Sequence, residues 1–314
     1  MHSLDRKIYT NVAVITPTFN RPDSVIRTAE SILADSNSSI TYIVVDQDRS
    51  GETRRAFRES GLSRDPRFTY LFSDIAGESR ARNIGMRHAL RQFDQTVLVG
   101  IDDDCIATDR FASRYLELFN RTGSDMHFAS MMRPENVEGL VPVFTPEERT
   151  VIHIDEDATT KLGMSGNFAI TSELFRKVGP FDELLGSGSR IGAGDDLDYA
   201  IRAARLGALI TTGPEPEVVH YGARIGADDR ELRMRYIRGF VALAKKHHMY
   251  DDPLLEKELT ALAKRSVLEV AQSIISLKRP SGLSTLAAIA EGIWMMRQYE
   301  KNPETDHRIL KEKV

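Results

Sequence analysis

The first hundred residues alternate between short apolar runs and segments whose apolar residues recur at helical spacing. Residues 11–19 (NVAVITPTF) and 40–46 (ITYIVVD) are predicted to be buried strands. Between them, Pro22 marks the start of a predicted helix. Its apolar positions share one helix face, namely Val25, Ile26, Ala29, Ile32 and Leu33. This alternation predicts an α/β protein with a mostly parallel sheet that carries helices on both faces.

The same pattern continues along the chain. A short strand is predicted over 68–74, a helix over 77–93 and a buried strand over 97–101. After weaker strand patterns there follows a strand–helix–loop–helix–strand series, and from Glu231 onward the pattern is helical. The sequence therefore predicts a sheet-bearing unit over 1–222 and a C-terminal helical region over 223–314.

Composition narrows the class of protein. The 314 residues are 41% hydrophobic and 28% charged, as in ordinary globular enzymes, and the net charge of −4 disfavours a nucleic-acid partner. The one cysteine, Cys105, excludes an intramolecular disulfide and suits a reducing compartment. No signal peptide or apolar membrane span is evident in the pattern. We expect a cytoplasmic protein.

Polar, mostly acidic loops follow three of the predicted strands. Because ligands bind beyond the carboxyl ends of parallel strands, we expect these loops to meet at one ligand site. The loops are Thr16-Pro17-Thr18, Asp46-Gln47-Asp48 and Asp102-Asp103-Asp104.

The third loop has the chemistry of a cation site. On extended chain, Asp102 and Asp104 point to the same face, so both carboxylates can reach one object. Oxygen ligands of this kind suit Mg²⁺ or Mn²⁺, usually shared with substrate phosphates. The alternative is an acidic surface turn, or caps for a helix that starts near Thr108.

Five blocks in order carry a family resemblance. They read VAVITPTFNRPDSVIRTAESIL, IVVDQDRSGE, GESRARNIGMRHAL, VGIDDDCI and GDDLDYAIRAARLG. Over about residues 10–222 the chain resembles a family-2 glycosyltransferase with the GT-A fold, a Rossmann-like sheet with helices on both faces. The resemblance implies a nucleotide-diphosphate sugar donor, most commonly a UDP-sugar, and transfer with inversion at the anomeric carbon. It also implies a divalent metal, Mn²⁺ or Mg²⁺.

The resemblance assigns donor contacts to the first blocks. Pro17 and Thr18 match the residues that line the nucleotide base and ribose. Asp46 matches the residue that accepts from the uracil or its neighbourhood, and Arg82 and Asn83 match the segment that flanks the nucleotide.

The resemblance also assigns a metal site. Asp102 matches a residue that contacts ribose or sugar hydroxyls and is also expected as a metal ligand, and Asp104 matches the direct metal ligand. His220 follows a short strand where many GT-A enzymes complete the metal site, and neutral imidazole is a competent ligand. A purely structural histidine is the alternative.

The last block supplies the expected base. Inverting transfer needs a carboxylate that takes the proton of the acceptor hydroxyl, and Asp196 matches the family's base. Asp195 and Asp198 are left as cap and acceptor contacts, and an N-cap role is the alternative for Asp196 itself. The sequence departs from the family pattern at Glu52, where Asp is usual, and at Asp195, where Glu is usual.

The remaining segments leave alternatives open. The glycine-rich stretch 184–196 is either a surface loop or an acceptor-side lid, and Trp294 with its methionine neighbours suggests core packing or the face of a homo-oligomer. We expect a saccharide or lipid-linked glycan as acceptor. A basic patch near the diphosphate or near anionic lipid heads, with peripheral membrane contact, is predicted from Arg230, Arg233, Arg235, Arg238, Lys245 and Lys246.

Three other functions compete with this one. A sugar-nucleotide nucleotidyltransferase would carry a glycine-rich loop after its first strand, and residues 15–23 contain no glycine. A phosphatase with an Asp-x-Asp nucleophile would carry its acids after the first strand rather than a later one. A non-catalytic nucleotide-sugar-binding module would have no need of intact Asp102, Asp104 and Asp196.

Overall fold

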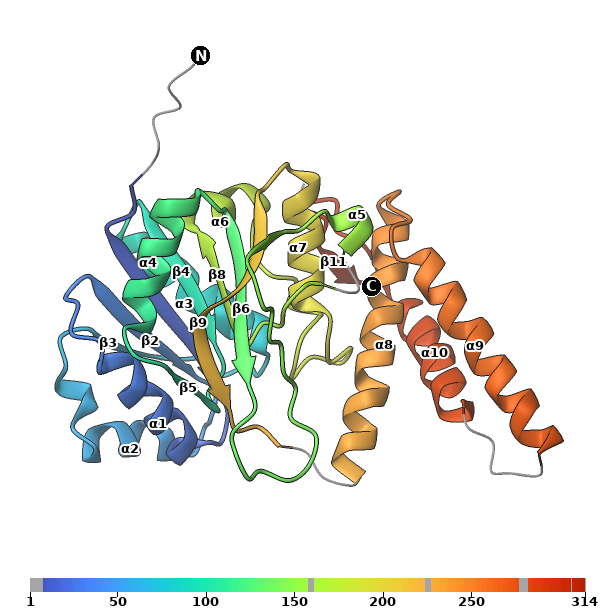
Figure 1. The fold of residues 1–314 in the computed structure, drawn as a ribbon, viewed down its shortest axis with the longest axis horizontal. Helices are drawn as coiled ribbons and strands as arrows, with labels where there is room; N and C mark the ends of the chain where they lie inside the picture. Colours follow the sequence, from blue (N-terminus) through green and yellow to red (C-terminus); the bar gives the residue numbers. More distant parts are fainter. Residues whose placement is uncertain (1–7, 158–160, 224–226, 277–281, 306, 314) are drawn as a thin grey trace, which may run out of the picture.

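A computed structural model describes residues 8–157, 161–223, 227–276, 282–305 and 307–313. In Figure 1, a twisted sheet between helices forms the larger part of the molecule, and three C-terminal helices pack against one side of it. The α/β architecture predicted from the alternating pattern is confirmed, including the C-terminal helices.

The described residues form one nine-stranded mixed sheet. Its first strands, β3, β2, β1 and β4, run parallel, while β8 pairs antiparallel with both β4 and β6. Beyond β6 lie β9 and β5, and β7 pairs with β9 off this path. The strands are β1 (Asn11–Thr18), β2 (Ile40–Asp46), β3 (Phe68–Phe72), β4 (Thr96–Ile101), β5 (Cys105–Ala107), β6 (Met126–Met132), β7 (Thr150–Val151), β8 (Asn167–Thr171) and β9 (Ile210–His220).

Two hydrophobic clusters cover the two faces of the sheet. Alternate residues of a strand point to opposite faces, so β1 gives Val12 and Val14 to one cluster and Ala13 and Ile15 to the other. The first cluster includes residues of α1 (Pro22–Leu33), α2 (Glu52–Glu59) and α4 (Phe111–Thr122). The second includes residues of α3 (Glu78–Gln92), α5 (Ile154–Asp157), α6 (Ser172–Val178) and α7 (Asp195–Arg205).

The C-terminal helices share the second cluster. Residues of α8 (Ala227–Met249) and α10 (Leu283–Met296) are buried together with Ile15 of β1 and Tyr199 of α7. The remaining elements are α9 (Glu256–Ile275), the short helix η1 (Leu62–Arg64) and the antiparallel pair of β10 (Tyr299–Lys301) and β11 (Leu310–Glu312). A boundary between residues 222 and 223 stays a prediction, with one hydrophobic cluster spanning it. Among the described helices, none combines the length and the apolar character that crossing a bilayer requires.

Two helices of the first face were not predicted. In α2 the sequence ETRRAFRE offers Phe57 as its main apolar anchor, too few apolar positions to reveal a helical period. In α4 the signal is present, because Phe111, Tyr115, Leu118 and Phe119 recur at helical spacing and are all buried. One of the weaker strand patterns predicted from the sequence covers residues 150–155. It is confirmed only at its start, where β7 has two residues and α5 follows.

Candidate active site

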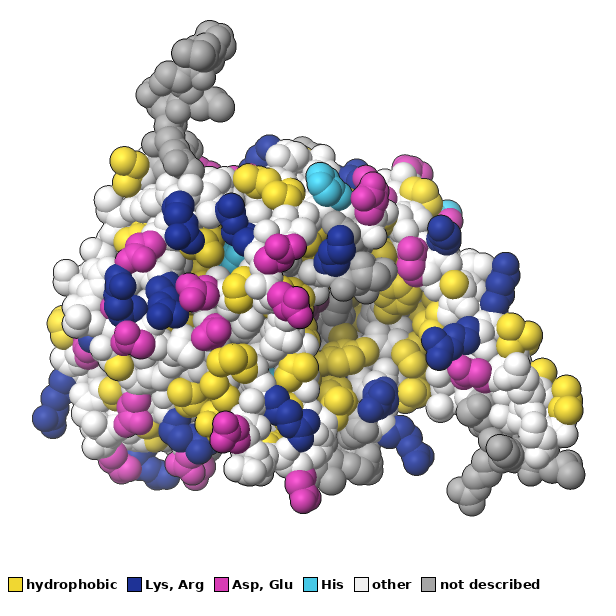
Figure 2. Space-filling view, viewed as in Figure 1, with side chains coloured by type: hydrophobic (Ala, Val, Ile, Leu, Met, Phe, Trp, Pro, Cys, Tyr) yellow, Lys and Arg dark blue, Asp and Glu magenta, His cyan; other side chains and the backbone are white. Residues whose placement is uncertain are grey.

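A cleft of about 820 Å³ opens at the carboxyl ends of the parallel strands. Its floor is made by the ends of β1, β2 and β4, so the three polar loops meet as predicted. The opposite wall comes from one face of α8, which contributes Leu232, Arg235, Tyr236, Phe240 and Leu243. In Figure 2, apolar side chains gather in the hollow between the sheet-bearing part and the C-terminal helices.

The middle acid of the Asp-Asp-Asp run has a structural role. Asp103 is 6% exposed, and the Thr18 hydroxyl donates to its carboxylate at 2.8 Å. Arg21 donates from Nη1 to Asp103 and to Asp104, each at 2.9 Å. Burial raises the pKa of Asp103, and Arg21 opposes that rise. One arginine from the start of α1 thus offsets part of the repulsion between neighbouring carboxylates.

Asp104 and His220 come together as the metal prediction requires. His220 Nε2 lies 3.2 Å from Asp104 Oδ1, and its Nδ1 donates to the Pro142 carbonyl at 3.0 Å. That bond directs Nε2 at the carboxylate, in the way that outer hydrogen bonds orient metal-binding histidines. Burial lowers the pKa of His220, but the Asp104 carboxylate outweighs it, and the net shift is upward.

A glycine leaves room for an ion beside this pair. A Cβ on Gly222 would lie 2.5 Å from Asp104 Oδ2 and 2.6 Å from His220 Nε2. The space that this glycine keeps free is therefore bordered by one carboxylate and one imidazole, and these residues fit a divalent cation such as Mn²⁺. Cys105 has its sulfur within 4.8 Å of the same ligand atoms, but burial raises the pKa of its thiol well above the ordinary value. A protonated thiol is a poor ligand, so among the residues that the structure describes, Asp104 and His220 are the protein ligands available here.

Arg82 is the centre of the acidic wall rather than a donor contact. Its side chain is fully buried and donates to Asp195 at 2.7 Å, to Asp102 at 3.2 Å and to the Ser165 carbonyl at 3.1 Å. It also pairs with Glu78 one helical turn earlier. The expected contact of Arg82 with the nucleotide is thus replaced by a role in holding three carboxylates, and the arginine itself does not line the cleft.

Two of the carboxylates, Asp102 and Asp195, have strongly raised pKa values. Burial, with Glu78 and Asp104 adding to it, raises the pKa of Asp102 to about 7, while Arg82 opposes the rise. Burial and Glu78 also raise the pKa of Asp195 well above its usual range. Asp102 does not belong to the group that could hold a metal among the described residues, since its carboxylate faces Arg82 and the backbone of Gly166.

Asp196 lies in the cleft without an ion-pair partner among the described residues. Its carboxylate accepts from the backbone N–H of Leu197 at 2.8 Å and of Ser165 at 3.2 Å. Burial raises its pKa, and these two N–H groups with Arg82 oppose the rise. The N-cap of α7 is Gly194, with φ of 94° and no side-chain cap bond, so neither acid of the pair is the N-cap residue.

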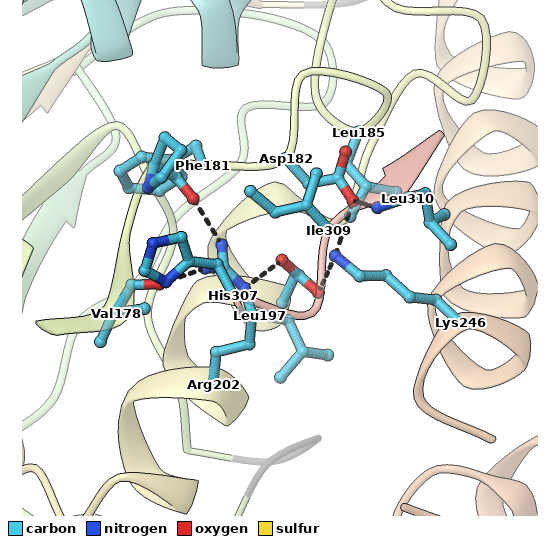
Figure 3. Close-up of polar contacts among 12 residues, drawn as sticks. Val178, Phe181, Asp182, Leu185, Leu197, Arg202, Lys246, His307, Ile309 and Leu310 are labelled. Atoms are coloured by element: carbon cyan, nitrogen blue, oxygen red, sulfur yellow. Dashed lines mark hydrogen bonds and ion pairs between the residues drawn. The ribbon is translucent and has the colours of Figure 1, made fainter. Parts of the chain in front are cut away.

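Asp198 points away from the cleft, contrary to the expected acceptor contact. Its fully buried carboxylate pairs with Lys246 of α8 at 2.7 Å and with Arg202 at 2.9 Å. Lys246 also pairs with Asp182 at 2.7 Å, and Asp182 accepts from the Leu310 backbone at 3.0 Å. Burial alone would raise the pKa of Asp198, but Lys246 and Arg202 shift it far below its ordinary value. Figure 3 shows this cluster, which ties α7 to α8 and to the C-terminal strand.

The residues of the predicted basic patch do not gather on one surface, because they have different partners. Lys246 is buried beside Asp182, and Arg238 pairs with Glu231 and Glu291. Arg235 turns into the cleft.

The predicted donor residues separate into two groups. Pro17 and Thr18 line the cleft, whereas Asp46 and Asn83 do not. Asp46 is fully buried behind the strand end, where it accepts from the Asp48 backbone at 2.9 Å and from the Tyr70 hydroxyl. Asn83 is fully buried as well, with its amide bonded to both backbone groups of Phe181.

Several cleft residues were missed in the sequence. Gln47 replaces Asp46 at the surface of the cleft and accepts from the Gly77 backbone at 2.6 Å. Phe19 is a half-exposed aromatic in the wall, and Glu78 completes the acidic group around Arg82. Gln47, Glu78 and Phe19 all lie inside the five blocks, so position could have indicated them, but nothing local distinguishes Phe19 from a core aromatic.

The comparisons place the chain in a known family. The family model of Glycosyl transferase family 2 matches residues 13–177, which is more than half of the chain, and the protein belongs to this family. It is a nucleotide-sugar-dependent glycosyltransferase. A comparison with curated proteins finds no match.

Two solved structures share the fold. One is the mannosyltransferase PcManGT from Pyrobaculum calidifontis in complex with GDP-Man and Mn²⁺, with a TM-score of 0.59 and 17% identity over 92% of this chain and 89% of that one. The other is S. aureus TarS, with a TM-score of 0.54 and 14% identity over 76% of this chain; the match spans only 39% of TarS. At these identities the likeness shows the fold, and the predicted GT-A fold is confirmed.

Proposed function

We propose that the protein transfers a sugar from a nucleoside-diphosphate sugar to an acceptor hydroxyl with inversion, and that a divalent cation assists. The observation that supports this most directly is the meeting of Asp104, His220 and Asp196 in one cleft. Gly222 keeps space for an ion beside the first two. When bound there, Mn²⁺ or Mg²⁺ would neutralise charge on the leaving diphosphate.

The chain's own residues have three tasks in this proposal. Pro17 and Thr18, at the end of β1, border the nucleotide. Asp102, held by Arg82, faces the sugar or ribose hydroxyls. Asp196 accepts the proton of the attacking hydroxyl, because its carboxylate is accessible from the cleft and burial makes it a stronger base. Asp195 is the less suitable base, since its carboxylate is already paired with Arg82.

The nucleotide is proposed to be UDP, with GDP as the second candidate. The second candidate rests on the mannosyltransferase of similar fold, which was solved with GDP-Man. The acceptor is proposed to be a saccharide or a lipid-linked glycan. The test is a melting scan of the protein with UDP, GDP, CDP and ADP, each with Mn²⁺, with Mg²⁺ and with excess chelator.

Because a ligand that binds only the folded protein raises its melting temperature, one nucleotide should stand out, and only with metal. Equal stabilisation in chelator would contradict the metal role. Stabilisation by GDP alone would replace UDP without changing the rest of the proposal. No stabilisation by any nucleoside diphosphate would contradict the donor assignment.

A further inference from the structure

The basic residues of the cleft differ in whether they form ion pairs. Arg21 and His220 both pair with Asp104. Arg235 also lines the cleft, yet within the described ranges it forms no ion pair, and its Nε is buried without a hydrogen-bond partner. A ligand can supply the hydrogen-bond acceptors that this guanidinium lacks.

The position of Arg235 is fixed by close backbone packing. A Cβ on Gly192 would lie 2.7 Å from Cδ and 2.8 Å from Cγ of Arg235, so the side chain rests directly on this glycine. Four residues further along α8, a Cβ on Gly239 would lie 2.8 Å from the Cβ of Ala193. The helix therefore sits on the loop that leads into Asp196, and Arg235 has little freedom to swing away.

The energetics indicate an anionic ligand. A buried N–H without an acceptor is costly, and a phosphate or carboxylate can satisfy an arginine fork with two parallel hydrogen bonds. The neighbours of Arg235 in the wall, Leu232, Tyr236 and Phe240, offer no carboxylate. An anion that enters the cleft can therefore pair with a guanidinium that has no acidic partner among the described residues.

The location separates this anion from the donor's diphosphate. The cation space lies between Asp104 and His220 at the ends of β4 and β9, where Arg21 also lies. Arg235 instead lies on the loop immediately before Asp196, which is the side from which an acceptor must approach the proposed base. We propose that Arg235 binds a phosphate or carboxylate group of the acceptor, next to the hydroxyl that is glycosylated. This inference rests on the proposed function.

The acceptor is accordingly an anionic sugar: a sugar phosphate, a uronic acid, or a sugar joined through phosphate to a lipid. The probe is inorganic phosphate, titrated calorimetrically into protein that is already saturated with the stabilising nucleoside diphosphate and Mg²⁺. Arg235→Gln should weaken phosphate binding by at least about tenfold, and Arg235→Lys should weaken it less. The affinity for the nucleoside diphosphate should stay within about twofold in both variants.

Arg238→Gln is the matched control, because Arg238 lies on the same helix but is held by Glu231 and Glu291 away from the cleft. It should bind phosphate like the parent. Glucuronate and decyl phosphate, titrated in the same way, distinguish a carboxylate from a phosphate and a free sugar acid from a lipid-borne group.

Three results would overturn the inference: no phosphate binding by the parent, equal binding by parent and Arg235→Gln, or a large loss of nucleoside-diphosphate affinity in Arg235→Gln. The last result would assign the arginine to the donor. If no nucleoside diphosphate binds at all, the proposed donor fails, while a phosphate titration in chelator still reports on Arg235.

Discussion

Replacement of Asp196 by asparagine isolates the proton-accepting charge. The amide oxygen introduced by Asp196→Asn can still accept from the Leu197 backbone, but the new amino group cannot accept from Ser165. Losing one such hydrogen bond costs about 1 kcal/mol. The loss of a general base costs about 10²–10⁴ in rate, or about 3–5 kcal/mol of activation free energy. The effect on transfer should therefore far exceed the effect on folding.

Asp195→Asn should have the opposite signature. Asp195 is 4% exposed and its carboxylate pairs with the fully buried Arg82. The asparagine keeps one acceptor for Arg82 but removes a charge-assisted bond, which is worth about 1–3 kcal/mol. We expect a melting temperature lower by several degrees, at about 2–4 °C per kcal/mol for a large domain.

The assay combines melting curves, nucleoside-diphosphate affinity and turnover of donor for parent, Asp196→Asn and Asp195→Asn. For Asp196→Asn we expect a near-parental melting temperature and donor affinity, with a large loss of turnover. If Asp195→Asn loses turnover while it melts and binds donor like the parent, the base is Asp195. If both variants keep full turnover, inverting transfer assisted by either acid is refuted.

Three further predictions concern metal, pH and the buried ion pairs. Asp104→Ala removes one assigned metal ligand, and Gly222→Ala places a Cβ in the ion space. Both variants should lose metal-dependent stabilisation by nucleoside diphosphate and keep a nearly unchanged melting curve without ligand. Retained metal dependence in both would contradict the assigned ligands. Burial lowers the pKa of His127 to about 4, below its unfolded value. The free energy of unfolding should therefore fall by about 3 kcal/mol as the pH falls from about 6.5 to 4. In a His127→Gln variant the free energy of unfolding should depend less on pH over this window. Lys246→Met leaves Asp182 and Asp198 buried without their shared cation and should cost about 3–5 kcal/mol by denaturant unfolding, whereas a change under about 1 kcal/mol would show that this cluster does not hold α8 to α7.

The sequence by itself determined the elements whose signal is local. The apolar runs of β1, β2 and β4, the helical periods of α1 and α3, and the loops that end the strands are each contained in a short window. Parallel pairing then brings Thr18 level with Asp46, and it carries the acids of the third loop to the same edge. The parallel half of the sheet and the edge at which the three loops meet therefore follow from the pattern.

Only the tertiary structure decided which side chains face the cleft. Asp46, Arg82 and Asn83 stand in the expected segments, yet they turn inward to bind Tyr70, Asp195 and Phe181. A one-residue shift along a strand reverses the face, so Gln47 rather than Asp46 borders the cleft.

The same reason applies to the C-terminal part. Arg235, Arg238 and Lys246 look alike in the sequence, but their surroundings along α8 differ: the first lines the cleft, the second pairs with surface acids and the third forms a buried ion pair. Contacts far along the chain fix these directions, and no local pattern encodes them: Gly192 for Arg235, Glu291 for Arg238 and Asp182 for Lys246. The helix period is local, but the partner that each face meets is set by the packing of the whole chain.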